Sequence, residues 1–147
     1  MRVPVPLNGH PKDAKGEARP DLSSDPFAGM EVEGRLHAVS VSGRENHSAF
    51  VRFHLGSRKF SDPLARAIVA LRRRLMLGQE RPQQAADELK LLTQTTDVLA
   101  LLAPLGLDIA SLQSNAPEGA AEQVPGQLWA LACLLYTSDA ADDSWFV

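Results

Sequence analysis

The sequence predicts an α+β fold, in which a β-hairpin over about residues 32–55 packs on two or three short helices. Residues 32–41 and 49–55 are rich in Val, Phe and Leu and contain no proline, and a polar segment with Gly43 separates them. After residue 60, apolar residues recur every three or four positions between helix start and stop signals. The length of 147 residues suits one domain with a core.

The predicted hairpin has one apolar face. Val51, Phe53 and Leu55 alternate along the second strand, while Arg52 and His54 point to the other side. An isolated hairpin is marginally stable in water, so we expect the apolar face to pack under the helices.

The clearest helix is predicted over residues 63–77. Asp62 is a capping residue directly before Pro63, which suits the first helical position, and Gly78 supplies a stop. One apolar stripe runs along it at spacings of four, three and four: Leu64, Ile68, Leu71 and Leu75.

Two further helices are predicted, over about 82–94 and 97–103. Pro82 opens the first, and Thr96 and Asp97 cap the second. Pro104 and Gly106 are expected to stop the second helix, after which Asp108 caps a last turn.

The remaining residues divide by composition. Residues 1–29 contain five prolines and no periodicity, which predicts a disordered arm before a small α+β domain at 30–114. Proline and glycine predict a linker at 115–127, and residues 128–135 read as the start of a truncated helix. We expect residues 136–147 to be a non-native tail and the C-terminus to be truncated.

The tail prediction rests on a resemblance. Residues Leu134–Asp143, with the sequence LLYTSDAADD, resemble a translated sequencing-adapter read-through. No protein family is recognised for residues 1–133. The resemblance implies a metagenomic, bacterial source and a gene interrupted near Cys133.

Composition excludes several classes of protein. Cys133 is the only cysteine, so neither an intrachain disulfide nor a cysteine-rich metal site is available. We expect no membrane partner, because no apolar run reaches the roughly 18 residues of a membrane span. A cytoplasmic location is therefore predicted.

The middle of the chain is basic. Residues 35–81 carry ten Lys or Arg against three acids, a balance of +7. Arginine suits bidentate contacts with phosphate, so nucleic acid or another anionic partner is a candidate ligand. Alternatively, the arginine triplet only covers the solvent side of its helix. The candidate binding residues are Arg35, Arg52, Arg58, Lys59, Arg66, Arg72, Arg73 and Arg74.

Other chemistry finds little support in the sequence. His37, His47 and His54 are candidate metal ligands, and a symmetric hairpin would make His37 and His54 cross-strand neighbours. Although Glu45 is close to His47, no carboxylate or cysteine completes the set at a convincing spacing, so no metal site is predicted. No phosphate-binding loop or nucleophile motif occurs, so no cofactor and no catalytic residue is assigned, and enzyme activity stays uncertain.

The sequence thus favours a non-enzymatic binding or adaptor module that contacts an anionic partner through residues 35–81. Two alternatives stay open. The chain is the N-terminal fragment of a larger enzyme, or it is an assembly component whose apolar helical stripes bind a protein partner or a second copy.

Overall fold

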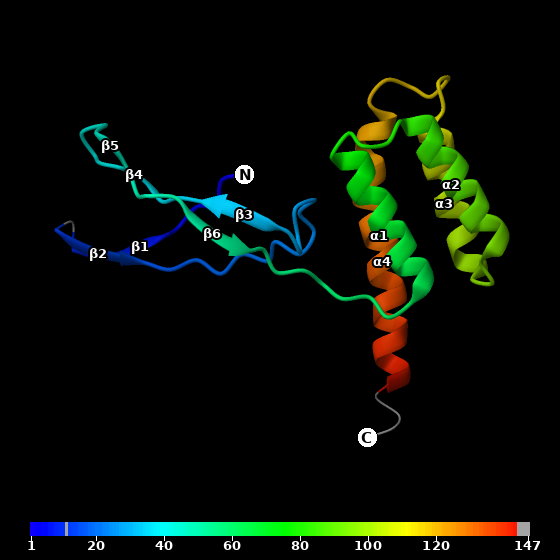
Figure 1. Ribbon diagram of the computed structural model, residues 1–147, viewed down its shortest axis with the longest axis horizontal. Coiled ribbons are helices and arrows are strands. Elements are labelled where there is room, and N and C mark those ends of the chain that lie inside the picture. The colour runs from blue at the N-terminus through cyan, green and yellow to red at the C-terminus, as the bar shows by residue number, and fades with distance from the viewer. Residues whose placement is uncertain (11, 144–147) are drawn as a thin grey trace. The chain divides into compact units, whose positions relative to one another are not determined.

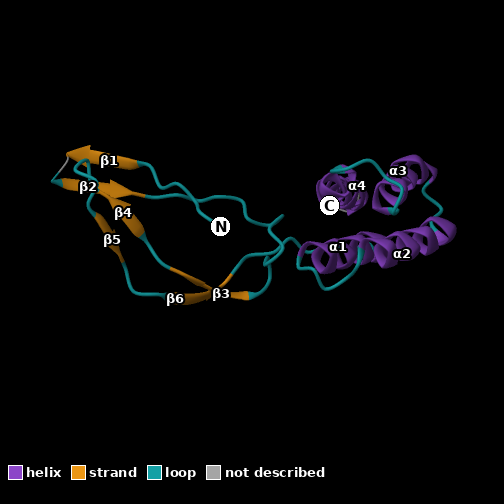
Figure 2. Cartoon of the chain, turned by 90° about the horizontal axis from the view of Figure 1, so that it is seen from above, coloured by secondary structure: helices purple, strands orange, loops and turns teal. Residues whose placement is uncertain are grey.

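The computed structural model describes residues 1–10 and 12–143, and it confirms the predicted α+β class. The chain forms two compact units, Met1–Ser57 and Arg58–Val147. The first contains the strands and the second the helices (Figures 1 and 2).

The N-terminal unit contains three antiparallel two-stranded sheets. Two of them are successive stretches of one long hairpin, which confirms the predicted hairpin position. The sheets pair β1 (Leu7–His10) with β2 (Asp13–Gly16), β3 (Glu31–Gly34) with β6 (Val51–His54), and β4 (His37–Val39) with β5 (Glu45–His47).

An extra residue lies between the two stretches of this hairpin. Gly34 pairs with Val51 and His37 with His47, so two residues on one strand face three on the other. Such an insertion behaves as a β-bulge and changes which side chains share a face. The considered pairing of His37 with His54 is therefore wrong, because His37 lies opposite His47 and His54 opposite Glu31.

The predicted disordered arm differs from the structure. Strands β1 and β2 pair within residues 7–16, although all eight of their residues are exposed. Backbone hydrogen bonds rather than apolar burial hold this pair, and for this reason no apolar periodicity marks it in the sequence.

The helical unit begins with α1 (Pro63–Met76), close to the predicted bounds. Asp62 caps the helix by accepting a hydrogen bond from the backbone nitrogen of Ala65 at 2.9 Å. Gly78 follows the helix at a φ of +66°. The second helix, α2 (Pro82–Thr95), also confirms its prediction within one residue.

Two predicted boundaries were wrong. A short 3₁₀ turn, η1 (Leu99–Leu101), leads into α3 (Leu102–Leu112), so Pro104 does not stop the helix. Proline is tolerated there because the first-turn N–H groups lack intrahelical acceptors. The helix α4 (Ala120–Asp143) covers most of the predicted linker and passes through Pro125.

The course of α4 follows its apolar side. Val124, Leu128, Leu131 and Leu135 are buried at helical spacing, and their burial favours a continuous helix despite the proline. Residues 128–135 are therefore the middle of a helix and not its start. Its backbone continues to Asp143, and residues 144–147 of the predicted tail lie outside the described residues.

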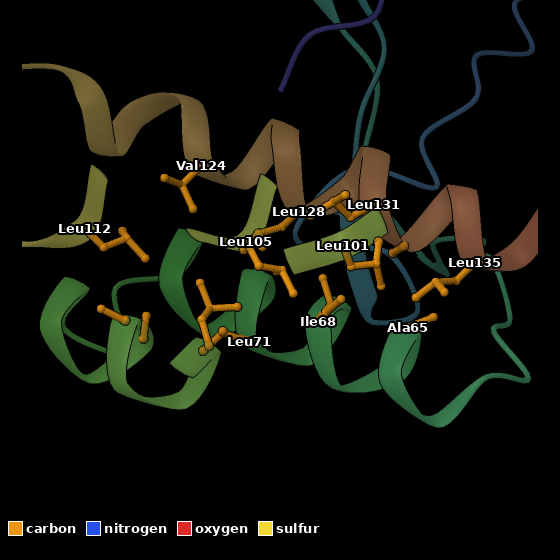
Figure 3. Close-up of a cluster of buried hydrophobic side chains, with 14 of the residues drawn as sticks. Ala65, Ile68, Leu71, Leu101, Leu105, Leu112, Val124, Leu128, Leu131 and Leu135 are labelled. Carbon is orange, nitrogen blue, oxygen red and sulfur yellow. The ribbon is translucent and has the colours of Figure 1, made fainter. Parts of the chain in front are cut away.

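One apolar core holds the helices together (Figure 3). Helix α1 packs on α4 and α2 on α3, and α3 also contacts α4. Ile68, Leu71, Leu89, Leu105 and Leu128 are fully buried in this core. Within the described ranges 1–10 and 12–143, no helix has both the length and the apolarity that a membrane crossing requires.

Candidate functional site

The predicted basic residues belong to both units. Arg35 and Arg52 lie in the N-terminal unit, and the other six lie in the helical unit. Only a residue whose guanidinium or ammonium group is exposed to solvent is available to a ligand.

The arginines of the hairpin have partners within the hairpin. Arg52 donates from Nε to Glu33 Oε1 at 2.7 Å, and the guanidinium carbon of Arg35 lies 5.0 Å from the centre of the Phe50 ring. His54 lies opposite Glu31 on the same face as Arg52. Acidic residues thus lie opposite the basic ones on this face.

Arg72 is a structural residue of the helical core. Its side chain donates from Nε to the carbonyl oxygen of Pro125 at 2.8 Å, and its guanidinium carbon lies 5.1 Å from the Trp129 ring centre. Only 7% of Arg72 is exposed. A carbonyl oxygen has two lone pairs, so Pro125 can accept this bond in addition to a helical one. The residue therefore joins α1 to α4.

Arg74 joins α1 to the following turn and to α2. It donates from Nε to Glu80 at 2.8 Å and from Nη2 to Glu88 at 2.6 Å. The hydrogen bonds to Glu80 and Glu88 raise the pKa of Arg74 above its ordinary value. Two arginines of the triplet thus serve different contacts of α1, Arg72 with α4 and Arg74 with α2, and Arg73 between them is half-buried.

Arg58 contacts the same aromatic residue as Arg72. Its Nη1 atom lies 3.3 Å from Cys133 Sγ, and its guanidinium carbon lies 5.7 Å from the Trp129 ring centre. Phe60 meets Trp129 edge-on at 5.7 Å. Among the six candidate residues of this unit, Lys59 and Arg66 are exposed and are therefore best placed to meet a ligand.

The β3–β6 stretch presents an exposed apolar surface. Val32, Gly34, Val51 and Phe53 share one side of the stretch, and we call them the apolar ribbon face. Val51 is 63% and Phe53 47% exposed. The Phe53 ring covers Gly34, because a Cβ built there would lie 2.9 Å from Phe53 Cε1. In the helical unit, by contrast, the large apolar side chains of the core are buried.

The β4–β5 stretch gathers three possible metal ligands that sequence reasoning did not combine. His37 and His47 are directly opposite each other, and Glu45 Oε2 lies 3.4 Å from His37 Nε2. All three residues are exposed. The polar composition of residues 42–48 predicts a loop, whereas Glu45–His47 form strand β5 in the structure.

A pocket of about 600 Å³ lies at the start of α2, beside the end of α3 and the α3–α4 loop. Gln83, Gln84 and Ser114 are among its lining residues. Within the part of the chain that the structure describes, the pocket lining includes no cysteine or histidine and therefore no nucleophile–histidine pair.

The fold and these surfaces define an α+β protein with a helical core and a largely exposed β-hairpin. A family model described as "Domain of unknown function (DUF4175)" matches residues 1–143, and the chain therefore belongs to this family. No curated protein and no solved structure matches the chain.

Proposed function

We propose that this protein is a non-enzymatic binding module that associates with a second copy of itself through the apolar ribbon face. The observation that carries the proposal is the exposure of Val51 and Phe53 side by side on β6. A two-stranded sheet is marginal alone, and contact with another apolar surface would stabilise it.

A second copy is a suitable partner because it presents the same apolar surface. Two such faces stacked about a two-fold axis would place apolar side chains against apolar side chains. The N-terminal unit carries seven basic and seven acidic side chains. Because its net charge is zero at neutral pH, no net electrostatic repulsion opposes the association of two copies.

The magnitude predicts a weak dimer. Full burial of one such side chain contributes about 1.5–3 kcal/mol, so four half-exposed ones supply about 3–6 kcal/mol. Association costs at least about 4 kcal/mol in lost translational and rotational freedom. At most about 2 kcal/mol therefore remains, which corresponds to a dissociation constant of about tens of millimolar or weaker for this face alone.

NMR chemical shifts of the hairpin, followed up to millimolar protein concentration, test the proposal, because they respond to a small fraction of dimer. The variant Val51→Thr/Phe53→Thr places β-branched residues suited to a strand at both positions and removes the apolar surface. We expect the resonances of the apolar ribbon face to shift with concentration in the unaltered protein and to stay constant in the variant. Val39→Thr is a matched control, since this exposed valine lies on β4, outside the apolar ribbon face. Shifts that do not depend on concentration, or equal shifts in the double variant, would refute the proposal.

An anionic partner is the second candidate, and the exposure of Lys59 and Arg66 is the observation that favours it. Replacing the arginine triplet is a poor test, because Arg72 and Arg74 hold the helices together. Lys59→Gln/Arg66→Gln is sharper. If this candidate is right, an oligonucleotide will bind with a steep salt dependence, and the double variant will weaken that binding.

The other expectations stay predictions. An independent read of the coding sequence across codons 130–147 tests both the adapter-like identity of Leu134–Asp143 and the alternative of a larger enzyme. The bacterial, cytoplasmic setting rests on the sequence alone.

A further inference from the structure

We propose that His37, Glu45 and His47 form a binding site for a divalent transition metal, with zinc as the metal best suited to it. Two imidazole nitrogens and one carboxylate oxygen are a ligand set that zinc accepts. One ligand atom from each of the three residues lies within 4.8 Å of the other two. The site lies on β4–β5 and is separate from the apolar ribbon face.

The backbone brings the two histidines close together. Ser48 donates from its backbone nitrogen to Leu36 at 3.0 Å, and Ser40 donates to Arg44 at 2.8 Å. Because hydrogen-bonded and non-hydrogen-bonded pairs alternate along an antiparallel sheet, His37 and His47 occupy a non-hydrogen-bonded pair. Side chains are closest at such pairs, and the two rings stack with centres 4.5 Å apart and planes 15° apart.

Glu45 completes the group from the same side of the sheet. It lies two residues before His47 on β5 and diagonally across from His37. Two nitrogen ligands of a tetrahedral zinc ion lie about 3.4 Å apart, given zinc–nitrogen bonds of about 2.0–2.1 Å. The stacked rings must turn out of their nearly parallel arrangement to direct one nitrogen each at a shared ion, and their exposed positions allow this rotation.

The turn fixes this arrangement. Gly43 has a φ of +79°, and its backbone nitrogen donates to Ser40 at 2.9 Å. Ser40 Oγ also accepts a hydrogen bond from the Arg44 nitrogen at 3.0 Å. A three-residue loop closed by a glycine in this conformation sets the register of a hairpin. A slip of one residue would move His37 and His47 to opposite faces.

Three protein ligands leave a fourth tetrahedral position for water or for a group from another molecule. Imidazole ligands also suit copper and nickel, and copper binds nitrogen–oxygen sites more tightly than zinc in general. The site is therefore defined by its ligands and geometry, and zinc, nickel and copper are the ions with which to examine it.

The test is calorimetric titration of tag-free, metal-depleted protein with zinc sulfate. We expect one zinc ion per chain, and we expect His37→Asn, His47→Asn and Glu45→Gln each to weaken binding. Loss of an outer-shell partner costs about tenfold or more at known sites, so loss of a direct ligand should cost at least this much. His54→Asn is the matched control, an exposed histidine of β6 outside the cluster, and it should bind as the unaltered protein does.

Gly43→Val keeps all three ligands and strains the turn, and it should weaken zinc binding while the helical unit unfolds at an unchanged temperature. Any of three outcomes would overturn the proposed intrachain site. The unaltered protein does not bind zinc, the His37 and His47 variants bind zinc as tightly as the unaltered protein does, or the protein binds one zinc ion per two chains.

Discussion

Asp108 makes the folding stability of the helical unit depend on pH. It lies in α3 on the same buried stripe as Leu101, Leu105 and Leu112, and none of its surface is exposed. Neither carboxylate oxygen has a hydrogen-bond partner among the described residues. Burial raises the pKa of Asp108 from 3.8 to about 6, because the charged form is poorly solvated there.

The sign of the effect follows from proton uptake. Below pH 3.8 the carboxyl group is protonated in both the folded and the unfolded chain, and it does not disfavour folding. Between 3.8 and about 6 the unfolded chain ionises first, so the free energy of unfolding falls as pH rises. The pKa difference of about 2.2, at 1.36 kcal/mol for each pKa unit, corresponds to about 3 kcal/mol lost by pH 7.

Urea denaturation at pH 4, 5, 6 and 7 measures this loss when the protein is compared with Asp108→Asn. Asparagine keeps the size of the side chain and removes its ionisation, so the stability difference between the two proteins should change by about 2.4 kcal/mol over this range, because about 0.5 kcal/mol is already lost at pH 4. Asp97→Asn is a matched control, since Asp97 is an exposed acid of the same unit. A difference that stays constant with pH would show that Asp108 is solvated or paired in solution, and the reasoning would then fail.

Two predictions concern other contacts of the helical unit. Arg72→Ala should lower the free energy of unfolding by about 2–5 kcal/mol, because it removes a charged hydrogen bond and a cation–π contact, whereas Arg66→Ala should change it by less than about 0.5 kcal/mol. Urea denaturation followed by Trp129 fluorescence checks both, and equal effects would contradict the structural role of Arg72. Asp62→Ala should cost about 1 kcal/mol through loss of the α1 cap, and unchanged thermal unfolding would contradict that cap.

The helices were predictable where local signals and tertiary burial agree. Asp62 and Pro63 mark the start of α1, and the buried side of that helix follows the apolar spacing of its sequence. In α4 the local sequence signals and the tertiary burial disagree. Pro125 and Gly126 predict a break, but apolar residues before and after them continue one buried stripe. Burial of that stripe offsets the lost helical hydrogen bond, and a local reading of proline cannot weigh it.

The candidate metal site was not predictable because register is not a local property. The strand Glu45–His47 is polar and fully exposed, so no apolar alternation distinguishes it from a loop. The extra residue between the two stretches of the hairpin also changes the pairing of His37. A signal for Asp108 did exist, since it continues the spacing of Leu101 and Leu105 toward Leu112. Its polar side chain suggested a cap instead.

The two units can be followed separately in one experiment. All four histidines lie in residues 1–57, and both tryptophans lie in residues 58–147. Tryptophan fluorescence therefore reports unfolding of the helical unit, where Asp108 predicts greater stability as pH falls from 6 toward 4. Zinc binding reports the hairpin, because all three proposed ligands lie there. Asp108→Asn should thus reduce the pH dependence of helical stability and leave zinc binding at pH 7 unchanged, and a variant that altered both would contradict the independence of the two units.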